Sequence, residues 1–495
     1  MTGSPTLVWF HLDLRLADNP ALEKAMARRG PILPVFIWAP DEDAPWSPGA
    51  ASRWWMHQSL RELQASLAER GSKLIIRRGP TVVTLLALAA ESGAKVIFWN
   101  RRYEPAAIAR ERELERRARE CGFAAEACPG NLLFEPGTIL NKDGKPFRVF
   151  TAFWRACLAM ADPPEPGLAP ARILAPARWP SSMDISELGL EPQVDWAAGM
   201  RQAWRPGAAS AASRLEAFIK SARVASYFKD RDRPDHDGTS RLSPHLHFGE
   251  ISARQIWHAL RGGLRSLGAD RTAELYSAEP YLRQIAWREF SYHLLFHFPQ
   301  TPQEPMRPEF RSFPWRMDPR SLKMWTRGET GYPLIDAGMR ELWHTGWMHN
   351  RVRMVAASFL VKHLLIPWQE GAAWFWDTLV DADLANNTMG WQWSAGCGAD
   401  AAPYFRIFNP VIQGERFDPD GAYVRRWVPE LAGIPAAWIH KPWKAPRSLL
   451  SEAGVELGKG YPEPIVEHEV ARKRALAALA GMQGGGRRRQ NQSLR

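Results

Sequence analysis

The chain has 495 residues, of which 45% are hydrophobic and 24% charged, as is usual for a soluble globular protein of two or more domains. Its net charge of +11 favours a polyanionic partner such as DNA or RNA, although any generally basic protein shows this balance. There is no apolar run of the ~18–20 residues that a membrane span needs, no signal-peptide pattern and no metal-binding spacing among the four cysteines. We therefore expect a cytoplasmic protein with no membrane association, no disulfide framework and no metal site.

The first 130 residues alternate segments typical of strands with segments typical of helices. The strand candidates read TLVWFHL, ILPVFIW, KLIIRRG and KVIFWN, and most are rich in apolar and β-branched residues. Helices are predicted over residues 20–27, 52–70, 81–92 and 105–121. This alternation predicts an α/β domain over residues 1–130, a doubly wound parallel sheet with helices on both faces.

The remaining chain changes character twice. Proline-rich pieces such as ADPPEPGLAPARILAPARWP predict a long interdomain linker over residues 131–210. Residues 211–480 are predicted to form an all-α domain, with helices over 211–226, 252–267, 281–296, 332–345, 350–365 and 370–379. Residues 481–495, which contain GGGRRRQNQSLR, predict a disordered basic tail.

One ligand site is suggested by the end of the last predicted strand. Asn100, Tyr103 and Glu104 lie at or just beyond the end of KVIFWN. Ligands bind beyond the carboxyl ends of strands in open α/β sheets, so a small-molecule site is plausible here. The chain has no GxGxxG or GxxxxGK[ST] pattern, which excludes an ordinary dinucleotide or P-loop site.

The segment DADLANNTMGWQW carries the strongest chemical signal. In a helix, Asn387 and Trp391 are four residues apart and share one face. A buried amide above an indole needs hydrogen-bond partners, which a large planar cofactor would supply. Aspartates at a helix start followed by a tryptophan-rich core would give the same pattern, so both interpretations stand.

Two further motifs fit a cofactor pocket. DGTSRLS offers hydroxyl and backbone donors to a phosphate or pyrophosphate, although an ordinary capped loop looks the same. In HNRVRM, Arg353 could form a bidentate ion pair with Asp381, or could be a surface arginine. Asn350 and Arg351 of the same motif could read a base edge or a phosphate.

Tryptophans could also bind a flat substrate. Trp287 and Trp393 could form two apolar walls of a cavity, with Gln284 preceding the first. Either tryptophan taken alone is better explained as core packing. The count of 24 tryptophans against 9 tyrosines does not decide, because indoles stack on bases and flavins and also fill cores.

Taken together, the motifs resemble a known family. In chain order they read WFHLDLRLADNPAL, SYFKDRDRPDHDGTSRLSPHLHFGEIS, AWREFSYHLLFHFP, TGYPLIDAGMREL, GWMHNRVRMVAASFLVKHLLIPW, DADLANNTMGWQW and APYFRIFNPVIQGERFDPDGAYVRRWVPEL. From about residue 6 to about residue 475 the chain resembles the photolyase/cryptochrome family. SRWWMHQSL and SPHLHFGEIS further resemble the bacterial cyclobutane pyrimidine dimer photolyases that stand close to plant cryptochromes. The resemblance implies an α/β antenna domain, a long linker and a helical domain that holds FAD.

The resemblance also implies which residues bind FAD. The matching positions are Tyr227, Thr239, Ser240, Leu242, Ser243, Arg353, Asp381, Asp383 and Asn387. Asn387 falls where the family faces flavin N5, a position held by Asn in photolyases and by Asp in plant cryptochromes. An amide cannot supply a proton to the flavin, so it favours the fully reduced anion that performs repair. The chain departs from the usual pattern at Asn386, where the family has Ala, and at Met389, where it has Gly.

Catalytic roles beyond Asn387 are implied for three tryptophans. Trp391, Trp368 and Trp315 match the family's electron-transfer chain, which runs from the flavin outward to solvent. An indole can be oxidised, and three in a row let a hole hop away before it recombines. This chain of indoles reduces the resting flavin in light and is distinct from repair itself.

The resemblance implies a dimer-repair substrate, with one exception. The positions matching DNA contacts are Arg231, Gln284, Trp287, Asn350, Arg351, Met354 and Trp393. Six-four photolyases carry histidines where Asn350 and Met354 stand. Gln284, however, replaces the Glu of most dimer photolyases, and six-four enzymes commonly have Gln there. We expect this change to tune efficiency more than substrate choice.

The implied function is that of a deoxyribodipyrimidine photo-lyase, a carbon–carbon lyase. It would split cyclobutane pyrimidine dimers in damaged DNA by electron transfer from photoexcited reduced FAD, and we expect a monomer. Alternatives are a cryptochrome-type blue-light receptor, a six-four photolyase, and a flavin-free tryptophan-rich DNA-binding module.

A second, antenna chromophore is also implied, and its identity stays open between a folate, a deazaflavin and occasionally another flavin. Asn100, Tyr103 and Glu104 lie near the expected site, whereas Ala106 and Ala107 replace the polar pair of one folate-binding subgroup. A different pocket could be lined by Arg53 and His57.

Overall fold

The computed structural model describes residues 3–221, 223–266, 271–401 and 405–492. Its packing divides the chain into two compact units. Unit 1 comprises Met1–Ala225, Ser240–Pro299 and Val380–Ala385, and unit 2 comprises Ser226–Thr239, Gln300–Leu379 and Asn386–Arg495. This division follows packing, whereas the boundaries near residues 130, 210 and 480 follow secondary-structure type and remain a prediction.

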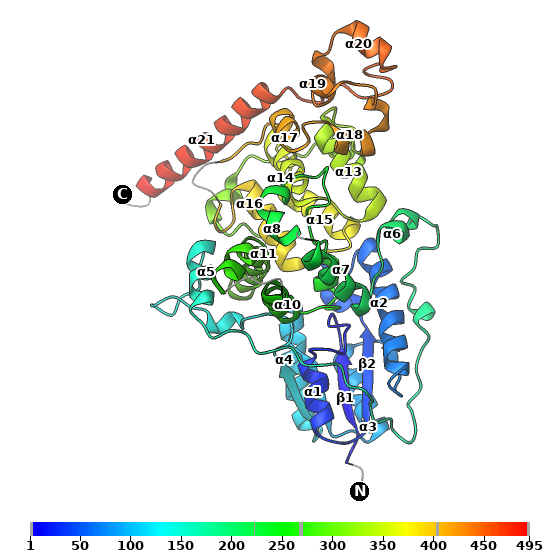
Figure 1. Ribbon diagram of the computed structural model, residues 1–495. Helices are drawn as coiled ribbons and strands as arrows, with labels where there is room; N and C mark the ends of the chain where they lie inside the picture. The colour runs from blue at the N-terminus through cyan, green and yellow to red at the C-terminus, as the bar shows by residue number, and fades with distance from the viewer. Residues whose placement is uncertain (1–2, 222, 267–270, 402–404, 493–495) are drawn as a thin grey trace. The chain divides into compact units, whose positions relative to one another are not determined.

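Unit 1 contains a parallel sheet of five strands in the order β3-β2-β1-β4-β5 (Figure 1). The strands are β1 (Thr6–Phe10), β2 (Ile32–Trp38), β3 (Ile75–Arg78), β4 (Val96–Asn100) and β5 (Ala124–Cys128). Thr6 of the central strand pairs with Ile32 on one side and with Val96 on the other. The predicted parallel sheet is confirmed. Only β5 escaped prediction, because its sequence AAEAC has no β-branched residue.

Helices cover both faces of this sheet. They are α1 (Pro20–Ala27), α2 (Ala50–Ala68), α3 (Thr81–Ser92) and α4 (Pro105–Glu120). On one face, alternate strand residues such as Leu7, Val35 and Ile97 form a core with Leu85 of α3 and Leu114 of α4. The chain adds β2 and then β3 on one side of β1, and β4 and then β5 on the other side. Because the crossovers between parallel strands are right-handed, the connections in these two directions place their helices on opposite faces, with α1 and α2 on the face opposite to α3 and α4. The doubly wound prediction is therefore confirmed.

The remaining regular elements of unit 1 are helices. Its elements are η1 (Pro40–Asp43), η2 (Pro136–Thr138), α5 (Phe150–Leu158), η3 (Ile185–Leu188), α6 (Ala198–Ala203), α7 (Ala208–Lys220), α9 (Ser243–His247), α10 (Ala253–Ser266) and α11 (Arg271–His297), while α8 (Arg223–Asp230) begins in unit 1 and ends in unit 2. The single helix predicted over residues 211–226 is wrong, because α7 ends before Ser221. The Ser221 hydroxyl donates to the carbonyl of Phe218, which competes with continued helical bonding.

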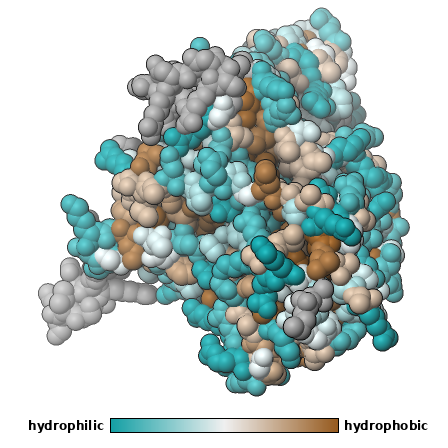
Figure 2. All heavy atoms as spheres, turned by 60° about the horizontal axis from the view of Figure 1, so that its bottom comes forward, coloured by the Kyte–Doolittle hydropathy of each residue, from teal (hydrophilic) through white to brown (hydrophobic). Residues whose placement is uncertain are grey.

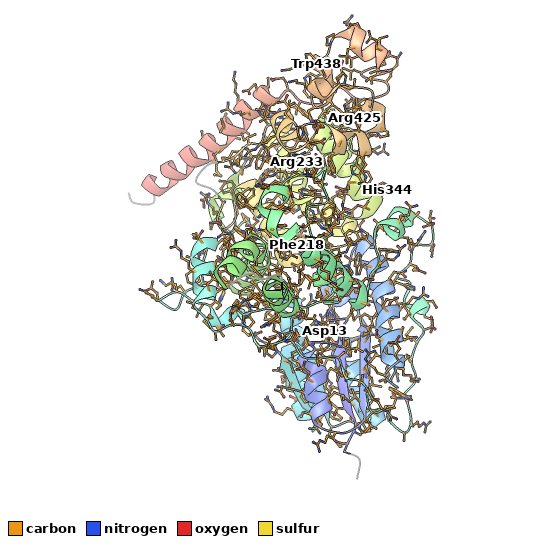
Figure 3. The ribbon with its side chains drawn as sticks, viewed as in Figure 1. Asp13, Phe218, Arg233, His344, Arg425 and Trp438 are labelled. Carbon is orange, nitrogen blue, oxygen red and sulfur yellow. The ribbon has the colours of Figure 1, made fainter. Side chains whose placement is uncertain are left out.

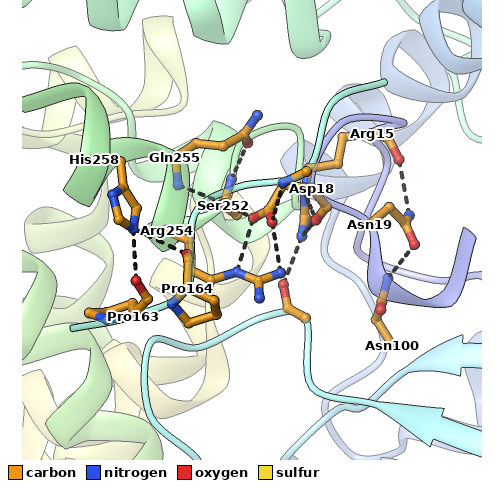
Figure 4. A network of polar contacts seen from close by, with 12 residues as sticks. Arg15, Asp18, Asn19, Asn100, Pro163, Pro164, Ser252, Arg254, Gln255 and His258 are labelled. Atoms are coloured by element: carbon orange, nitrogen blue, oxygen red, sulfur yellow. Dashed lines mark hydrogen bonds and ion pairs between the residues drawn. The ribbon is translucent and has the colours of Figure 1, made fainter. Parts of the chain in front are cut away.

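A buried polar network joins the loop after β1 to the start of α10 (Figure 4). Asp18 is buried and accepts a hydrogen bond at Oδ2 from Arg254 Nε at 3.2 Å, and the ion pair between the two residues places Arg254 Nη2 2.8 Å from Oδ1. The guanidinium of Arg15 donates to the carbonyls of Asp18 (Nη2–O 2.7 Å), Gly249 (Nη1–O 3.0 Å) and Gly130 (Nη2–O 2.7 Å). Because these carbonyls come from segments far apart in sequence, Arg15 fixes the sheet against the helical part of unit 1.

The proline-rich linker is held on α10 by polar contacts. His258 Nε2 lies 2.9 Å from the carbonyl oxygen of Pro163 (Figure 4). Arg261 pairs with Asp162 at 2.7 Å. These contacts order a segment that has little secondary structure of its own.

Unit 2 is built from helices joined by short loops. They are η4 (Pro308–Ser312), α12 (Pro319–Arg327), α13 (Pro333–Thr345), α14 (Asn350–Ser358), η5 (Phe359–His363), α15 (Trp368–Thr378), α17 (Pro410–Phe417), α18 (Ala422–Trp427), η6 (Pro429–Leu431), α19 (Ala436–Ile439), η7 (Pro442–Lys444), α20 (Arg447–Glu452) and α21 (His468–Gln492), while α16 (Leu384–Ala395) begins in unit 1 and ends in unit 2. The α-helix predicted over residues 350–365 ends at Ser358, and a π-helical turn follows it. π turns of this kind are frequent near functional sites.

The end of the chain differs from its prediction. The backbone of α21 continues as helix to Gln492, where the sequence predicts disorder over residues 481–495. Ala471, Ala475 and Met482 are buried along this helix and anchor it, so the helix extends from a packed base. Residues 493–495 lie outside the described part of the chain.

The surface in Figure 2 is largely hydrophilic, and hydrophobic side chains occur in small groups between polar ones. Among the residues that the structure describes, no helix combines the length and the apolar character that crossing a bilayer requires.

Candidate functional site

The predicted cofactor segment is helical from Leu384 onward, in α16, and the part of this helix that lies in unit 2 packs on α15. Asn387 donates from Nδ2 to the carbonyl of Ala372 at 3.1 Å. Trp391 lies against Gly371, where an added Cβ would come within 2.0 Å of indole Cη2. The amide and the indole therefore share a face, and glycine is needed beneath the indole ring. Because the Ala372 carbonyl accepts a hydrogen bond from Asn387, the neutral side-chain amide of Asn387 is held in a fixed orientation.

The three tryptophans assigned to electron transfer differ in burial. Trp391 and Trp368 are fully buried, whereas Trp315 is partly exposed. Trp391 also meets two aromatic neighbours, with ring centroids 5.0 Å from Phe375 and 6.2 Å from Trp325. A gradient from buried to exposed indoles is what an outward path for a hole requires. The order of hopping remains a prediction.

Asp383 lies in a buried charged cluster of unit 1. It accepts a hydrogen bond from the Tyr292 hydroxyl, and His247 Nδ1 lies 3.7 Å from its Oδ2. Burial raises the pKa of this carboxyl, but His247, Arg288 and the Tyr292 hydroxyl together bring the pKa well below its usual range. Asp383 is therefore ionised at neutral pH and can accept hydrogen bonds from a ligand.

The predicted phosphate motif precedes α9, also in unit 1. The Ser243 hydroxyl donates to Asp381 Oδ2 at 2.6 Å, and the Tyr281 hydroxyl donates to Ser240 Oγ at 2.8 Å. The backbone N–H of Leu242 also donates to Ser240 Oγ, at 3.3 Å. The structure thus brings Ser240, Leu242 and Ser243 together with Asp381, as a shared site requires.

The residues of unit 2 that are predicted to bind the flavin form a second set. Tyr227 is buried, and burial raises the pKa of its hydroxyl to about 12, so it stays a neutral donor. Thr239 is half-buried. Arg353 donates from Nε to the Met348 carbonyl at 2.7 Å, which orients its guanidinium. Its proposed ion pair with Asp381 joins residues of different units and stays a prediction.

The predicted DNA-contact residues of unit 2 include a row of charged groups. Arg231 lies over the Tyr227 ring at 5.8 Å, and its Nε is 3.8 Å from Asp232. Asp232 in turn pairs with Arg351 at 2.8 Å, and Arg351 lies over the Phe417 ring at 4.4 Å. Two arginines share one carboxylate, so these three side chains together carry a net positive charge, which suits a phosphate.

Unit 2 also carries Asn350, Met354 and Trp393, the other predicted lesion contacts of this unit. Asn350 is exposed, and its Nδ2 lies 3.8 Å from Met354 Sδ, so these two predicted lesion contacts are neighbours. Trp393 is half-buried on α16. Arg233 pairs with Asp235 at 2.8 Å and is labelled in Figure 3.

Gln284 and Trp287 project from α11 in unit 1. Gln284 donates one amide proton from Nε2 to the Pro280 carbonyl at 3.3 Å, which leaves its carbonyl oxygen and its second amide proton for a ligand. Trp287 is half-buried, and Phe150 of the linker stacks on it with ring centroids 3.7 Å apart and planes 7° apart. One face of the indole is therefore covered by the protein itself.

The residues at the end of β4 are held by contacts within the protein. The Asn100 side chain donates from Nδ2 to Oδ2 of Asp13 at 2.6 Å (Asp13 is labelled in Figure 3). The Tyr103 hydroxyl donates to Glu135, and Glu104 pairs with Arg102. These contacts give all three predicted antenna residues a structural role, and their contact with a chromophore stays a prediction.

Sequence reasoning missed the residues that support the site from behind. Tyr281, Tyr292 and His247 hold Ser240 and Asp383, and Phe150 covers Trp287. Each is aromatic or apolar enough to be interpreted as core filling. For Tyr292, the spacing in the sequence was an available signal, because it stands four residues after Arg288 and the two side chains are therefore neighbours on a helix. In the structure, the Arg288 guanidinium lies 4.9 Å from the centroid of the Tyr292 ring.

The donors and acceptors of each unit, taken separately, suit different parts of a dinucleotide flavin. Unit 1 offers hydroxyls at Ser240 and Ser243 beside the carboxylates Asp381 and Asp383, and unit 2 offers the neutral amide of Asn387. Hydroxyls suit a pyrophosphate, carboxylates suit ribityl hydroxyls and ring N–H groups, and a fixed amide suits a flavin ring edge. Among the described residues, no group of His, Cys, Asp and Glu side chains is arranged to hold a metal ion.

Comparison with known proteins agrees with this chemistry. Residues 6–171 match the family described as DNA photolyase, and residues 281–481 match the FAD binding domain of DNA photolyase. The chain is 48% identical over 480 residues to a deoxyribodipyrimidine photo-lyase of Agrobacterium fabrum, covering 97% of this chain and 98% of that protein. It is 42% identical over 484 residues to cryptochrome-2 of Arabidopsis thaliana, covering 96% of this chain and 78% of the cryptochrome.

A solved structure shares the whole fold. The crystal structure of a bacterial class III photolyase from Agrobacterium tumefaciens matches with a TM-score of 0.93 at 47% identity, covering 98% of both chains. Full-length identity well above 30%, together with both family domains in order, leaves no other assignment: the chain belongs to the photolyase/cryptochrome family, in the branch where bacterial photolyases stand close to plant cryptochromes.

Proposed function

We propose that this protein is a deoxyribodipyrimidine photo-lyase that uses light to split cyclobutane pyrimidine dimers in DNA. The observation that carries the proposal is the neutral amide of Asn387, oriented by its 3.1 Å bond to the Ala372 carbonyl in a chain of this family. An amide at this position cannot deliver a proton to the flavin, whereas the carboxyl of plant cryptochromes can. The amide of Asn387 at this position therefore favours repair over signalling.

FAD, when bound, supplies absorption of blue or near-UV light and transfer of one electron. The protein's residues bind and orient it. Ser240, Leu242 and Ser243, with Tyr227 and Thr239, would hold the phosphates. Asp381, Asp383 and Arg353 would hold the ribityl chain and the ring, and Asn387 would face N5. The hydrogen bonds within unit 1 support this assignment. Ser243 donates to Asp381, and Tyr292 donates to Asp383. The Tyr281 hydroxyl and the Leu242 backbone N–H both donate to Ser240.

The remaining site residues would act on DNA and on electrons. Arg231 and Arg351 would bind phosphates, and Asn350, Met354, Gln284, Trp287 and Trp393 would contact the flipped dimer. Flipping is helped because a lesion stacks and pairs poorly. Trp391, Trp368 and Trp315 would pass electrons inward to the resting flavin. We propose damaged DNA as the macromolecular partner of a monomeric protein.

The direct test is repair of a defined substrate. Purified protein with reduced flavin is mixed with an oligonucleotide carrying one thymine dimer, and monomeric thymines are measured by chromatography under blue light and in the dark. We expect light-dependent recovery only. Recovery in the dark, or none in light, would overturn the proposal.

One observation keeps a second substrate in view. Gln284 occupies a position where six-four photolyases commonly carry Gln, and its free acceptor oxygen could serve either lesion. Asn350 and Met354 argue against the six-four reaction, because histidines are expected there. The same oligonucleotide assay with a six-four photoproduct separates the two, and we expect no repair of that lesion.

We further propose a second, light-harvesting chromophore bound to the α/β part of the chain. Support comes from His11 and Arg110 at the carboxyl edge of the sheet, where Arg110 Nη2 lies 3.5 Å from His11 Nε2. Burial, then the charges of Arg102 and Arg110, keep the pKa of His11 well below its usual value, so the ring is neutral. The absorption spectrum of purified protein would distinguish a folate from a deazaflavin.

A further inference from the structure

Trp287, the indole proposed to face the lesion from α11, is stacked against a residue of the interdomain linker. The first residue of α5, Phe150, lies parallel to it, with centroids 3.7 Å apart and an interplanar angle of 7°. Phe150 is 1% exposed, whereas Trp287 is half-buried. The phenyl ring therefore covers one face of the indole and leaves the remainder of that side chain accessible.

The phenyl ring is itself fixed from several sides. The guanidinium of Arg283 lies over it at 5.2 Å, and since Trp287 occupies one face at stacking distance, Arg283 takes the other. Phe290 meets both rings edge-on, with centroids 5.9 Å from each. Just before α5, the backbone N–H of Phe147 donates to His293 Nε2 at 3.0 Å, which ties the linker to α11. Four side chains of one helix thus hold the linker segment in place.

From this arrangement we infer that Phe150 is a positioning residue for lesion binding, which holds the Trp287 indole in the plane that receives the flipped dimer. This inference rests on the proposed repair function. An indole on a partly exposed helix face can occupy several rotamers, and a lesion would have to select one of them. A stacked phenyl ring removes that freedom before DNA arrives, so binding does not have to order the side chain.

The inference is tested with three substitutions. Phe150→Leu keeps apolar volume but removes the stacked ring, and Phe150→Tyr keeps the ring. Phe153→Leu is the matched control, because Phe153 is buried in the same helix and packs on Phe290 and His293, with centroids 5.2 and 5.1 Å away, without stacking on Trp287. Affinities for a dimer-containing duplex and for its undamaged counterpart are measured in the dark, and repair per absorbed photon is measured at saturating DNA.

We expect Phe150→Leu to weaken dimer-specific binding about three- to tenfold, the range of an aromatic pair, with repair of bound dimer little changed. Phe150→Tyr and Phe153→Leu should keep the affinity of the unmodified protein. Equal losses in Phe150→Leu and Phe153→Leu, or no loss in Phe150→Leu, would overturn the inference.

A spectroscopic measurement separates this inference from the proposed function. Protein labelled with 5-fluorotryptophan gives a ¹⁹F resonance for Trp287, assigned by Trp287→Phe. In DNA-free protein, Phe150→Leu should shift and broaden this resonance, because the ring current and the restraint are lost, and Phe153→Leu should not. An unchanged resonance refutes the positioning role even if repair is observed. A shifted resonance in a protein that does not prefer dimer-containing DNA would refute the proposed function and leave the stacking role intact.

Discussion

At the scale of single residues, fixed orientation separates functional side chains from ordinary core. Asn387 could have been a polar residue in a tryptophan-rich core, but its amide is tied to Ala372 and its ring neighbour Trp391 rests on a glycine. Gln284 likewise donates one amide proton to the Pro280 carbonyl. In each case one hydrogen bond to the backbone fixes the orientation of the side-chain amide.

Substituting Asn387 tests this idea. Asn387→Asp would place a carboxyl against the Ala372 carbonyl, and that position favours a protonated carboxyl. We expect the variant to supply a proton to the flavin and to lose repair by at least about tenfold, a barrier increase of roughly 1.4 kcal/mol. Absorption spectra during illumination would report the protonated flavin, and the oligonucleotide assay would report repair. Full repair by this variant would contradict the role given to Asn387.

The two tryptophans of α16 should fail in different ways. Trp391→Phe should stop light-driven reduction of resting flavin yet leave repair by chemically pre-reduced protein within about twofold of the unmodified protein, because the two steps share no electron path. Trp393→Phe should instead weaken binding of dimer-containing DNA and spare photoreduction. Both variants are followed by flavin absorbance and by DNA binding in the dark. The same defect in both would refute the division of roles.

At the scale of elements, the close contact of α15 with α16 positions the site. Gly371 lies under the Trp391 ring with no room for a Cβ, so the two helices approach more closely there than larger residues would allow. The same α15 backbone accepts from Asn387. Two predicted functional side chains are therefore set by one helix pair.

A glycine pair tests that contact. Gly371→Ala should displace the indole, destabilise the fold by about 1–3 kcal/mol as overpacking does, and slow photoreduction. Gly390→Ala is the matched control on α16, because its Cβ would meet no atom within 4 Å. It should stabilise the helix by roughly 0.5–1 kcal/mol and leave photoreduction unchanged. Denaturant unfolding and flavin absorbance measure both effects, and similar behaviour of the two variants would contradict the model of helix contact.

At the scale of the whole molecule, buried titratable groups make stability depend on pH. His363 of η5 is fully buried, with Nε2 2.8 Å from Nδ1 of His468 at the start of α21. Burial, followed by the charges of His468, Arg474 and Lys362, lowers the pKa of His363 to about 3. The group is therefore neutral in the folded protein across the pH range in which it protonates when unfolded.

The sign of this effect follows from proton binding. Between the unfolded pKa of about 6.5 and the folded pKa of about 3, the unfolded chain holds more protons at His363, so its contribution to stability is lost as pH falls. His363→Leu removes this contribution. We expect its stability to fall less steeply than that of the unmodified protein between pH 6 and pH 4, by up to roughly 1.4 kcal/mol per pH unit. Thermal melts across this pH range measure the stability of both proteins. If the stability of the variant and of the unmodified protein fell in parallel as the pH is lowered, the assignment to His363 would be contradicted.

Much of this protein could be read from its sequence because the signals were local or long. Strand and helix alternation predicted the doubly wound sheet, since burial on both faces requires apolar strands between amphipathic helices. The order of motifs predicted the family, and the spacing of Asn387 and Trp391 predicted a shared helix face, which α16 confirms. The Ala-rich β5 could not be predicted, because its position comes from pairing with β4 rather than from its own side chains.

The contacts that hold the site residues in place are seen only in the folded structure. Hydrogen bonds from Tyr281 to Ser240 and from Tyr292 to Asp383, and the stacking of Phe150 on Trp287, join positions 41, 91 and 137 residues apart in the chain. Nothing in a single sequence marks such pairs, because any buried aromatic residue has the same local pattern. The order of residues specified which chemical groups the protein contains and which helices and strands carry them. Folding determined which of their atoms are fixed, covered or left open to a ligand, because that depends on packing between distant segments.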